Sequence, residues 1–177
     1  MKINRFHLCL IVTIATLNVS CSEPSALMFS TRATHFSSPE KFDTFILVGT
    51  GNDTLSSPMV FLIISSNGDT LWRDSFQSMD LIGYGLISTE RNNITDEQKR
   101  AYIAHRIRTF FDDREYFHPA IAENDTNASF SPDESVWEAI RNDSASVGFH
   151  YLIGEENNRN IAFCTSLRRV VVYSSFD

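Results

Sequence analysis

The sequence predicts an α+β protein: one antiparallel sheet of five to six strands, with two helices packed on one of its faces. Two observations support this fold class. Strand-like runs form two blocks, one before and one after a pair of helix-like segments. Within each block short turns join consecutive runs, and short turns imply antiparallel pairing.

The first block contains a hairpin signal. Residues 59–64 (MVFLII) are a continuous apolar run, which predicts a well-buried strand. Asn67-Gly68 follows and predicts a type I′ turn, with a return strand over residues 69–76. Residues 44–48 predict one further strand before this hairpin. Residues 22–42 are rich in Ser and Thr and lack a clean period, so we expect a flexible tether there and a single globular domain over residues 43–177.

Two capping boxes mark the predicted helices. Thr95–Gln98 begins a helix that is expected to run to about Asp112. Its apolar residues share one face, namely Ile103, Ile107, Phe110 and Phe111. Ser131–Glu134 begins a shorter helix that ends near Asn142 and carries an apolar stripe of Val136, Trp137 and Ile140. Three further strands are predicted over residues 147–153, 160–165 and 169–176.

Composition excludes several classes of protein. The chain has 177 residues, is 42% hydrophobic and carries a formal net charge of −7. The hydrophobic fraction is too high for a disordered chain. The acidic balance is wrong for a general nucleic-acid binder, which needs a basic surface.

The N-terminus has the layout of a secretory signal peptide over residues 1–20. Lys2 and Arg5 precede an apolar run over residues 6–19, and the small residue Ser20 stands before Cys21. The run is shorter and more interrupted than a transmembrane helix, so we expect a cleaved signal, with a retained membrane anchor as the alternative. The last five residues, Leu17–Cys21, resemble the lipobox of bacterial lipoproteins, although Asn18 stands where that family prefers an aliphatic residue.

This resemblance covers only the signal peptide and the lipobox. It implies a lipoprotein acylated at Cys21, held in the bacterial cell envelope and facing the periplasm or the cell surface. Without acylation, a Cys21–Cys164 disulfide is conceivable. Three tripeptides also resemble O-glycosylation sites of Bacteroidota, which favours a Bacteroidota-like source: Asp53-Thr54-Leu55, Asp69-Thr70-Leu71 and Asp143-Ser144-Ala145.

Two polar clusters are candidate sites. Acidic residues and one histidine follow the first predicted helix: Asp112, Asp113, Glu115 and His118. They are candidates for acid–base catalysis or for a metal site, and the alternative is a solvated helix end. Oxygen-bearing residues further on have the spacing of an EF-hand calcium loop: Glu123, Asp125, Asn127, Ser129 and Glu134. Ala128 occupies the position where that loop needs Gly, so we expect a polar surface loop rather than a metal site. No cofactor is indicated.

The expected function is that of a lipid-anchored envelope protein acting as a binding or accessory module rather than as an enzyme. Its expected partners are the membrane, through the anchor, and an envelope protein. One alternative is an envelope hydrolase that uses the cluster at residues 112–118. Another is an inhibitor or immunity-type protein with an acidic binding surface.

Overall fold

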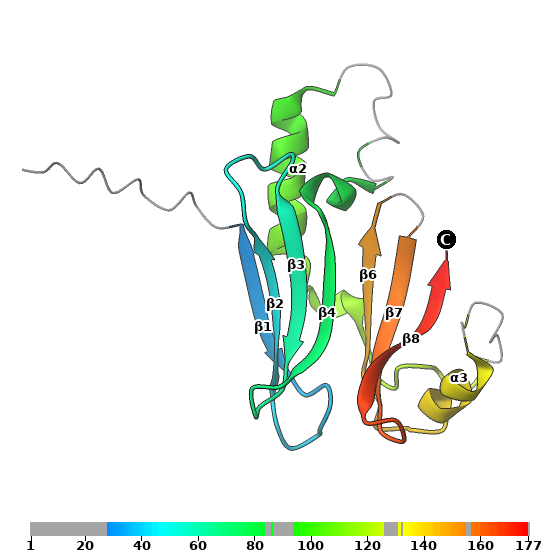
Figure 1. Cartoon of the computed structure of the whole chain (residues 1–177). Coiled ribbons are helices and arrows are strands. Elements are labelled where there is room, and N and C mark those ends of the chain that lie inside the picture. The colour runs from blue at the N-terminus through cyan, green and yellow to red at the C-terminus, as the bar shows by residue number, and fades with distance from the viewer. Residues whose placement is uncertain are drawn as a thin grey trace, which may run out of the picture.

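The chain folds into two four-stranded antiparallel sheets (Figure 1). The structure is a computed structural model that describes residues 28–83, 86, 94–125, 131, 133–154 and 157–176. The predicted signal peptide and lipobox lie outside the described residues. The first sheet has the order β1-β2-β3-β4 and the second the order β5-β6-β7-β8.

The bounds of the elements are as follows. The first sheet consists of β1 (Phe29–Thr34), β2 (Asp43–Gly49), β3 (Pro58–Ile64) and β4 (Thr70–Gln77). The second consists of β5 (Tyr116–Phe117), β6 (Gly148–Ile153), β7 (Asn157–Cys164) and β8 (Arg169–Phe176). The helices are α2 (Asp96–Arg108), α3 (Glu134–Arg141) and the 3₁₀ turns η1 (Ser78–Leu81) and η2 (Asp113–Glu115).

The prediction of a single sheet of five to six strands is wrong. The two strand blocks do not pair into one sheet; each forms its own, and the two sheets pack face to face. Phe45 and Phe61 of the first sheet and Phe149 of the second are fully buried between them. The ring centroids of Phe45 and Phe149 are 5.3 Å apart and those of Phe61 and Phe149 are 5.6 Å apart. Aromatic packing between the sheets therefore supplies the main core.

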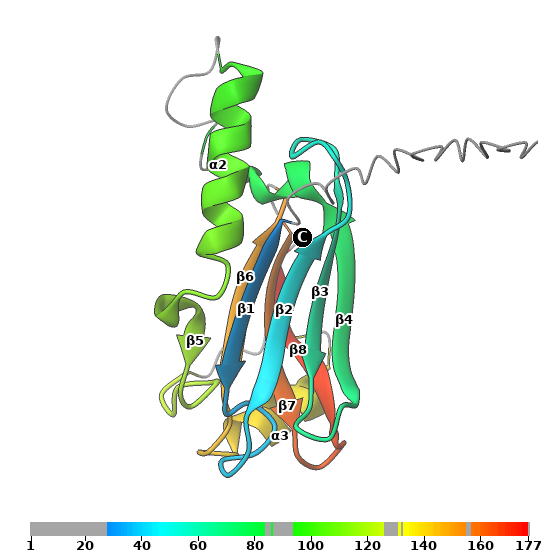
Figure 2. The same cartoon turned by 90° about the vertical axis from the view of Figure 1, so that its left-hand side faces the viewer.

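The second sheet is covered on both of its faces. Along β7, Ile161 packs into the core between the sheets, whereas Ala162 and Cys164 pack against α3 on the other face. Trp137 and Ile140 of α3 complete this second, smaller core. Helix α2 stands beside β1 and β6 along one side of the sandwich (Figure 2). The fold is therefore three layers, with α3 as the third.

Part of the predicted tether belongs to the folded domain. β1 pairs with β2 along its whole length, from Phe29 opposite Val48 to Thr34 opposite Asp43. Phe36 is 5% exposed, and its ring packs against Phe45. The segment from residue 29 onward is therefore ordered.

The β3–β4 hairpin is confirmed, but its turn is not type I′. Gly68 has a φ of +92°, whereas Asn67 does not have a positive φ. The N–H of Gly68 donates to the carbonyl of Ser65, and the ladder shifts register between Ile63 and Ile64. The loop is therefore a turn followed by a left-handed glycine and a bulge, which is a second common way to close a hairpin.

Both predicted helices exist, with changed ends. The Thr95–Gln98 capping box of α2 is present, but the helix ends at Arg108, so Phe110 and Phe111 are buried from the turn that follows it. The N-cap of α3 is Asp133, not Ser131, because its carboxylate accepts from the backbone N–H groups of the first turn. Among the described residues, no helix combines the length and the apolar character needed to cross a bilayer.

Candidate functional site

Three segments meet at one end of the sandwich: the β2–β3 loop over residues 50–57, η1 and the N-terminal half of α2. The chain also enters the domain at this end, where the N–H of Gly49 donates to the carbonyl of Met28 over 2.7 Å. This loop is the Gly-containing turn after β2, and it leads into β3, which pairs antiparallel with β2. It is a hairpin loop, which leads into no helix.

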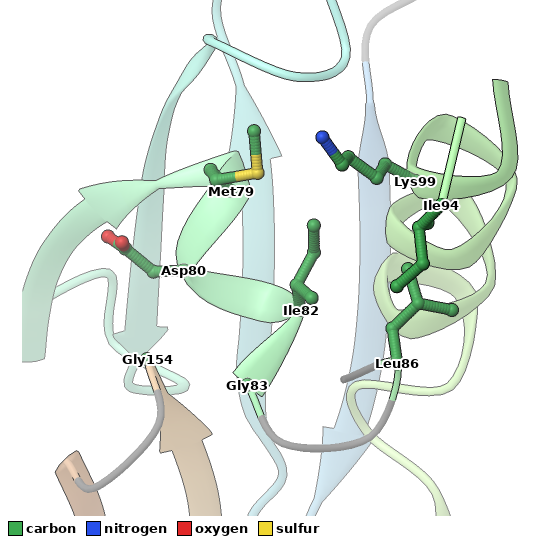
Figure 3. A pocket seen from close by; sticks show the side chains of 8 residues that line it. All are labelled: Met79, Asp80, Ile82, Gly83, Leu86, Ile94, Lys99 and Gly154. Carbon is green, nitrogen blue, oxygen red and sulfur yellow. The ribbon is translucent and has the colours of Figure 1, made fainter. Parts of the chain in front are cut away.

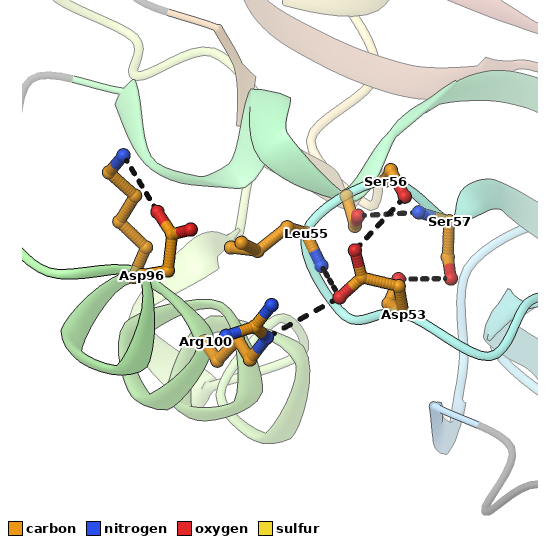
Figure 4. Close-up of polar contacts among 8 residues, drawn as sticks. Asp53, Leu55, Ser56, Ser57, Asp96 and Arg100 are labelled. Atoms are coloured by element: carbon orange, nitrogen blue, oxygen red, sulfur yellow. Dashed lines mark hydrogen bonds and ion pairs between the residues drawn. The ribbon is translucent and has the colours of Figure 1, made fainter.

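Asp53 ties this loop to α2 (Figure 4). One carboxylate oxygen accepts from the N–H of Leu55 over 3.2 Å and from Nε of Arg100 over 3.4 Å. The other accepts from the hydroxyl of Ser56 over 3.2 Å. These donors, above all the Leu55 N–H, hold the pKa of Asp53 below its usual value because they favour the charged carboxylate.

Buried serines tie the same loop to η1. The N–H of Ser57 donates to the hydroxyl of Ser78 over 3.0 Å, and the N–H of Ser78 donates to the carbonyl of Ser57 over 2.9 Å. The N–H of Gly154, just past β6, donates to the carbonyl of Asp80 over 2.6 Å. η1 is thus fixed to both sheets, and its position relative to α2 is set by the fold.

An apolar cleft of about 330 Å³ lies between η1 and α2 (Figure 3). Its volume is at the lower end of the range for small-molecule sites. The lining residues come from η1, from the segment between η1 and α2, from the first half of α2 and from just past the end of β6: Met79, Asp80, Ile82, Gly83, Leu86, Ile94, Lys99 and Gly154. Most of these side chains are apolar, and Met79 is 40% exposed.

Lys99 supplies the positive charge of this cleft. Its ammonium points across the cleft toward Met79, whereas the Asp80 carboxylate points away (Figure 3). That carboxylate instead accepts from the N–H of Gln77 over 2.7 Å. Asp96, one turn earlier on α2, is 3.3 Å from the Lys99 ammonium and is itself largely exposed. An exposed pair of this kind contributes little, so the ammonium is available to a stronger anionic partner.

The predicted catalytic cluster does not come together. Asp112 contacts Arg114 at 3.4 Å, and Asp113 forms an ion pair with Arg32 of β1. Glu115 turns instead to β6, where its carboxylate is 2.8 Å from Nδ1 of His150. The Nδ1 of the fourth member, His118, lies 3.2 Å from the carbonyl of Ser146. Arg114 also lies 3.9 Å from Glu115, so it contacts two of the four residues, but no hydrogen bond or ion pair among the described residues joins His118 to any of the three carboxylates.

The Glu115–His150 pair is the one acid–base contact that the cluster forms. The pair lines a pocket of only about 80 Å³, together with Arg106 and Thr109 of the α2 region. A volume of this size is far below that of ordinary substrate sites. The pair therefore orients η2 against β6 rather than facing a substrate cavity.

The calcium-loop residues also fail to form a site in the described part of the chain. Asn127 and Ser129 lie outside the described residues, whereas Glu123, Asp125 and Glu134 lie within them. Among the described residues, no group of three or more His, Cys, Asp or Glu side chains is placed to hold a metal ion. The described part of this segment leads to Asp133, which is the N-cap of α3.

Sequence reasoning did not single out the cleft. None of the residues that line the cleft is among the candidate site residues that the sequence indicates. The available signal was the recurrence of apolar residues at Met79, Leu81 and Ile82, which a solvated loop does not need. Leu81 is 2% exposed and anchors η1 in the core.

Comparison with protein-family models, with curated proteins and with solved structures found no match. The function of the chain is therefore argued from its own chemistry.

Of the three hydroxyls in the glycosylation-like tripeptides, Thr70 and Ser144 are exposed, whereas Thr54 is half-buried.

Proposed function

We propose that the chain is a lipid-anchored protein of a bacterial envelope that binds a small amphipathic anion in the cleft between η1 and α2. The observation that carries the binding function is the ammonium of Lys99, which points across a cleft whose other described lining side chains are mostly apolar. A site with this composition matches a ligand with an apolar body and one anionic head.

The signal-like N-terminus and the lipobox-like Leu17–Cys21 support the anchored location. The composition of the cleft favours binding over catalysis. Among the described lining residues the titratable side chains are Asp80, which points away, and Lys99, so no nucleophile and base converge among them. General acid–base and nucleophilic chemistry both need such convergent groups.

The ligand class follows from the energetics of the two parts of the cleft. Each methylene that enters the apolar part contributes about 0.8 kcal/mol. A carboxylate on the Lys99 ammonium adds a charge-assisted hydrogen bond, which is stronger than a neutral one. Medium-chain fatty acids combine both features and are the simplest probes.

The test is titration calorimetry of the chain from residue 21 onward with decanoate and with decanol. Lys99→Gln should weaken decanoate binding about tenfold, or about 1.4 kcal/mol, because it removes the charged donor. Decanol binding should stay unchanged. Lys41→Gln is the matched control, because Lys41 is exposed in the β1–β2 loop, away from the cleft lining.

The binding proposal fails if decanoate does not bind, or if Lys99→Gln weakens decanoate and decanol equally. An equal loss would mean that the substitution disturbs the cleft rather than the recognition of the head group. The anchoring proposal has a separate test, the intact mass of the native protein extracted from its source membranes. A species that begins at Cys21 and carries acyl chains is expected, and a soluble unacylated species would contradict it.

A further inference from the structure

The outer face of the first sheet is unusually apolar. This face consists of the outward positions of β1 to β4, which cross-strand register places side by side. Its centre is a block of five half-buried aliphatic residues on β2 and β3: Ile46, Val48, Val60, Leu62 and Ile64. Phe29 lies beside Val48 at the start of β1 and is 53% exposed.

No described element covers this face. Figure 2 looks directly onto it, and the described helices stand beside or behind the sheet. The inward residues of β3, Met59, Phe61 and Ile63, are fully buried, while its outward residues are aliphatic as well. A strand that is apolar on both faces is typical of a strand covered on both sides. The described fold provides the cover on one side only.

The face also differs in charge from the rest of the molecule. The chain has a net charge of −7, yet the outward positions of the four strands hold no Asp or Glu. Arg73 is the one charged residue among these positions, and it lies opposite Leu62. The remaining outward residues near the edges are small or uncharged: Thr31, Ala33, Thr44, Pro58, Thr70, Ser75 and Gln77. Because this surface has no carboxylates, anionic lipid head groups do not repel it.

We propose that the outer face of the first sheet rests on the surface of the bilayer to which the chain is anchored. This inference uses the lipid anchor of the proposed function, but not the ligand of the cleft. Phe29 is eight residues after Cys21. A chain of that length spans at most about 29 Å when fully extended, so the anchor holds Phe29 within that distance of the lipid head groups.

Because the tether is short, a weak contact between the outer face and the bilayer is enough to orient the domain. A flexible linker of a few residues gives an effective concentration in the millimolar range between the two parts it joins. The acyl chains supply the attachment, and the aliphatic block needs only to set the orientation of the domain. In this orientation, α3 lies on the side of the molecule away from the lipid (Figure 1).

The test attaches the chain from Cys21 onward to vesicles of phosphatidylethanolamine and phosphatidylglycerol through a maleimide lipid. Cys164 is 1% exposed, so Cys21 is the reactive thiol. Quenching of an added tryptophan by phospholipids with brominated acyl chains then measures its proximity to the bilayer. Thr31→Trp on the outer face should lose most of its added emission. Ser144→Trp, exposed beyond the C-terminal end of α3, should lose none.

A matched pair of substitutions identifies the contact. Leu62→Glu should abolish the quenching of a tryptophan at position 31, whereas Leu167→Glu, in the exposed turn before β8, should leave it unchanged. An equal fraction of emission lost by the two tryptophans on brominated vesicles that carry the protein would overturn the proposal. So would a dimer in solution that Leu62→Glu dissociates, because a second copy would then be the cover. Chemical attachment makes these outcomes independent of whether the native chain is acylated.

Discussion

Phe61 and Leu62 are neighbours on β3 whose side chains point to opposite faces of the first sheet. Phe61 is fully buried and packs against Phe149 across the core. Truncating a buried aromatic ring in this way costs about 3–5 kcal/mol of the free energy of unfolding. Leu62 is half-buried on the outer face. In solution without a membrane, Leu62→Ala should therefore lower the free energy of unfolding by about 1 kcal/mol or less.

Urea unfolding of Phe61→Ala and Leu62→Ala measures both values. The two variants should share the slope of the wild type and differ in midpoint. Similar losses in the two variants would mean that the outer face is covered within the monomer, which contradicts the described arrangement.

Asp133 gives a prediction about pH. Its carboxylate accepts from the hydroxyl and the N–H of Ser135 and from the N–H of Val136, and these bonds lower its pKa, the Ser135 hydroxyl most. A lowered pKa in the folded state means that the unfolded chain binds the proton more tightly. The cap therefore stabilises α3 above about pH 4 and loses its effect as the pH falls through the lowered value.

Asp133→Asn isolates this contribution, because an amide still caps a helix but does not titrate here. Urea midpoints followed from neutral pH down to about pH 3 should fall less steeply in the variant than in the wild type. Identical slopes with pH in the two proteins would show that the Asp133 carboxylate has no linkage to folding.

At the scale of elements, the α2 capping box controls both stability and the cleft. The hydroxyl of Thr95 accepts from the N–H of Gln98 over 3.3 Å, and the Gln98 side chain accepts from the N–H of Thr95 over 2.8 Å. Thr95→Ala should cost about 1 kcal/mol of the free energy of unfolding. It should also weaken both decanoate and decanol, because fraying of the first turn displaces Ile94. The loss should be larger for decanoate, because Lys99 moves as well.

Weaker binding of both ligands distinguishes the effect of the cap from that of the head-group contact. Lys99→Gln acts on decanoate alone, whereas Thr95→Ala acts on both ligands, and calorimetry of the two variants with the two ligands resolves the difference. Thr95→Ser keeps the hydroxyl and should behave as the wild type. A loss confined to decanoate in Thr95→Ala would contradict this role.

The elements that sequence reasoning predicted are those with local signals. The Thr95–Gln98 box, the β3–β4 hairpin and the three C-terminal strands are specified by residues a few positions apart. β1 has no such signal. Its sequence, FSTRAT, lacks an apolar alternation because it is an edge strand whose inward Arg32 reaches over the ring of Tyr116 at 4.6 Å. Its partner, β2, rather than its own sequence, determines that it is a strand.

The number of sheets could not be predicted for a related reason. The order of strands, helices and strands suits one sheet or two, and only contacts between distant segments decide between them. β5 is two residues long and exists because β6 pairs with it. The cleft likewise depends on where η1 sits against α2, which the Ser57–Ser78 contacts fix and the local sequence does not reveal.

At the scale of the whole molecule, each side of the sandwich has its own link between the sheets. Helix α2 stands along the β1 and β6 side (Figure 2). At β4, Asp74 of the first sheet accepts from the hydroxyl of Tyr151 over 2.9 Å and from the guanidinium of Arg159 over 2.6 Å. The Asp74 side chain is only 14% exposed. Burial, together with this carboxylate, raises the pKa of Tyr151 well above its usual value.

Asp74→Asn should therefore destabilise the fold by about 2–3 kcal/mol, because it leaves the Arg159 charge without its counterion in a partly buried place. The value is below that of a fully buried pair because Arg159 is 29% exposed. Replacing both charged partners, by Asp74→Leu with Arg159→Met, should restore all but about 1 kcal/mol, the share of the orphaned Tyr151 hydroxyl. Urea unfolding of Asp74→Leu, of Arg159→Met and of the double variant completes a double-mutant cycle. Purely additive losses would show that the ion pair does not couple the two sheets.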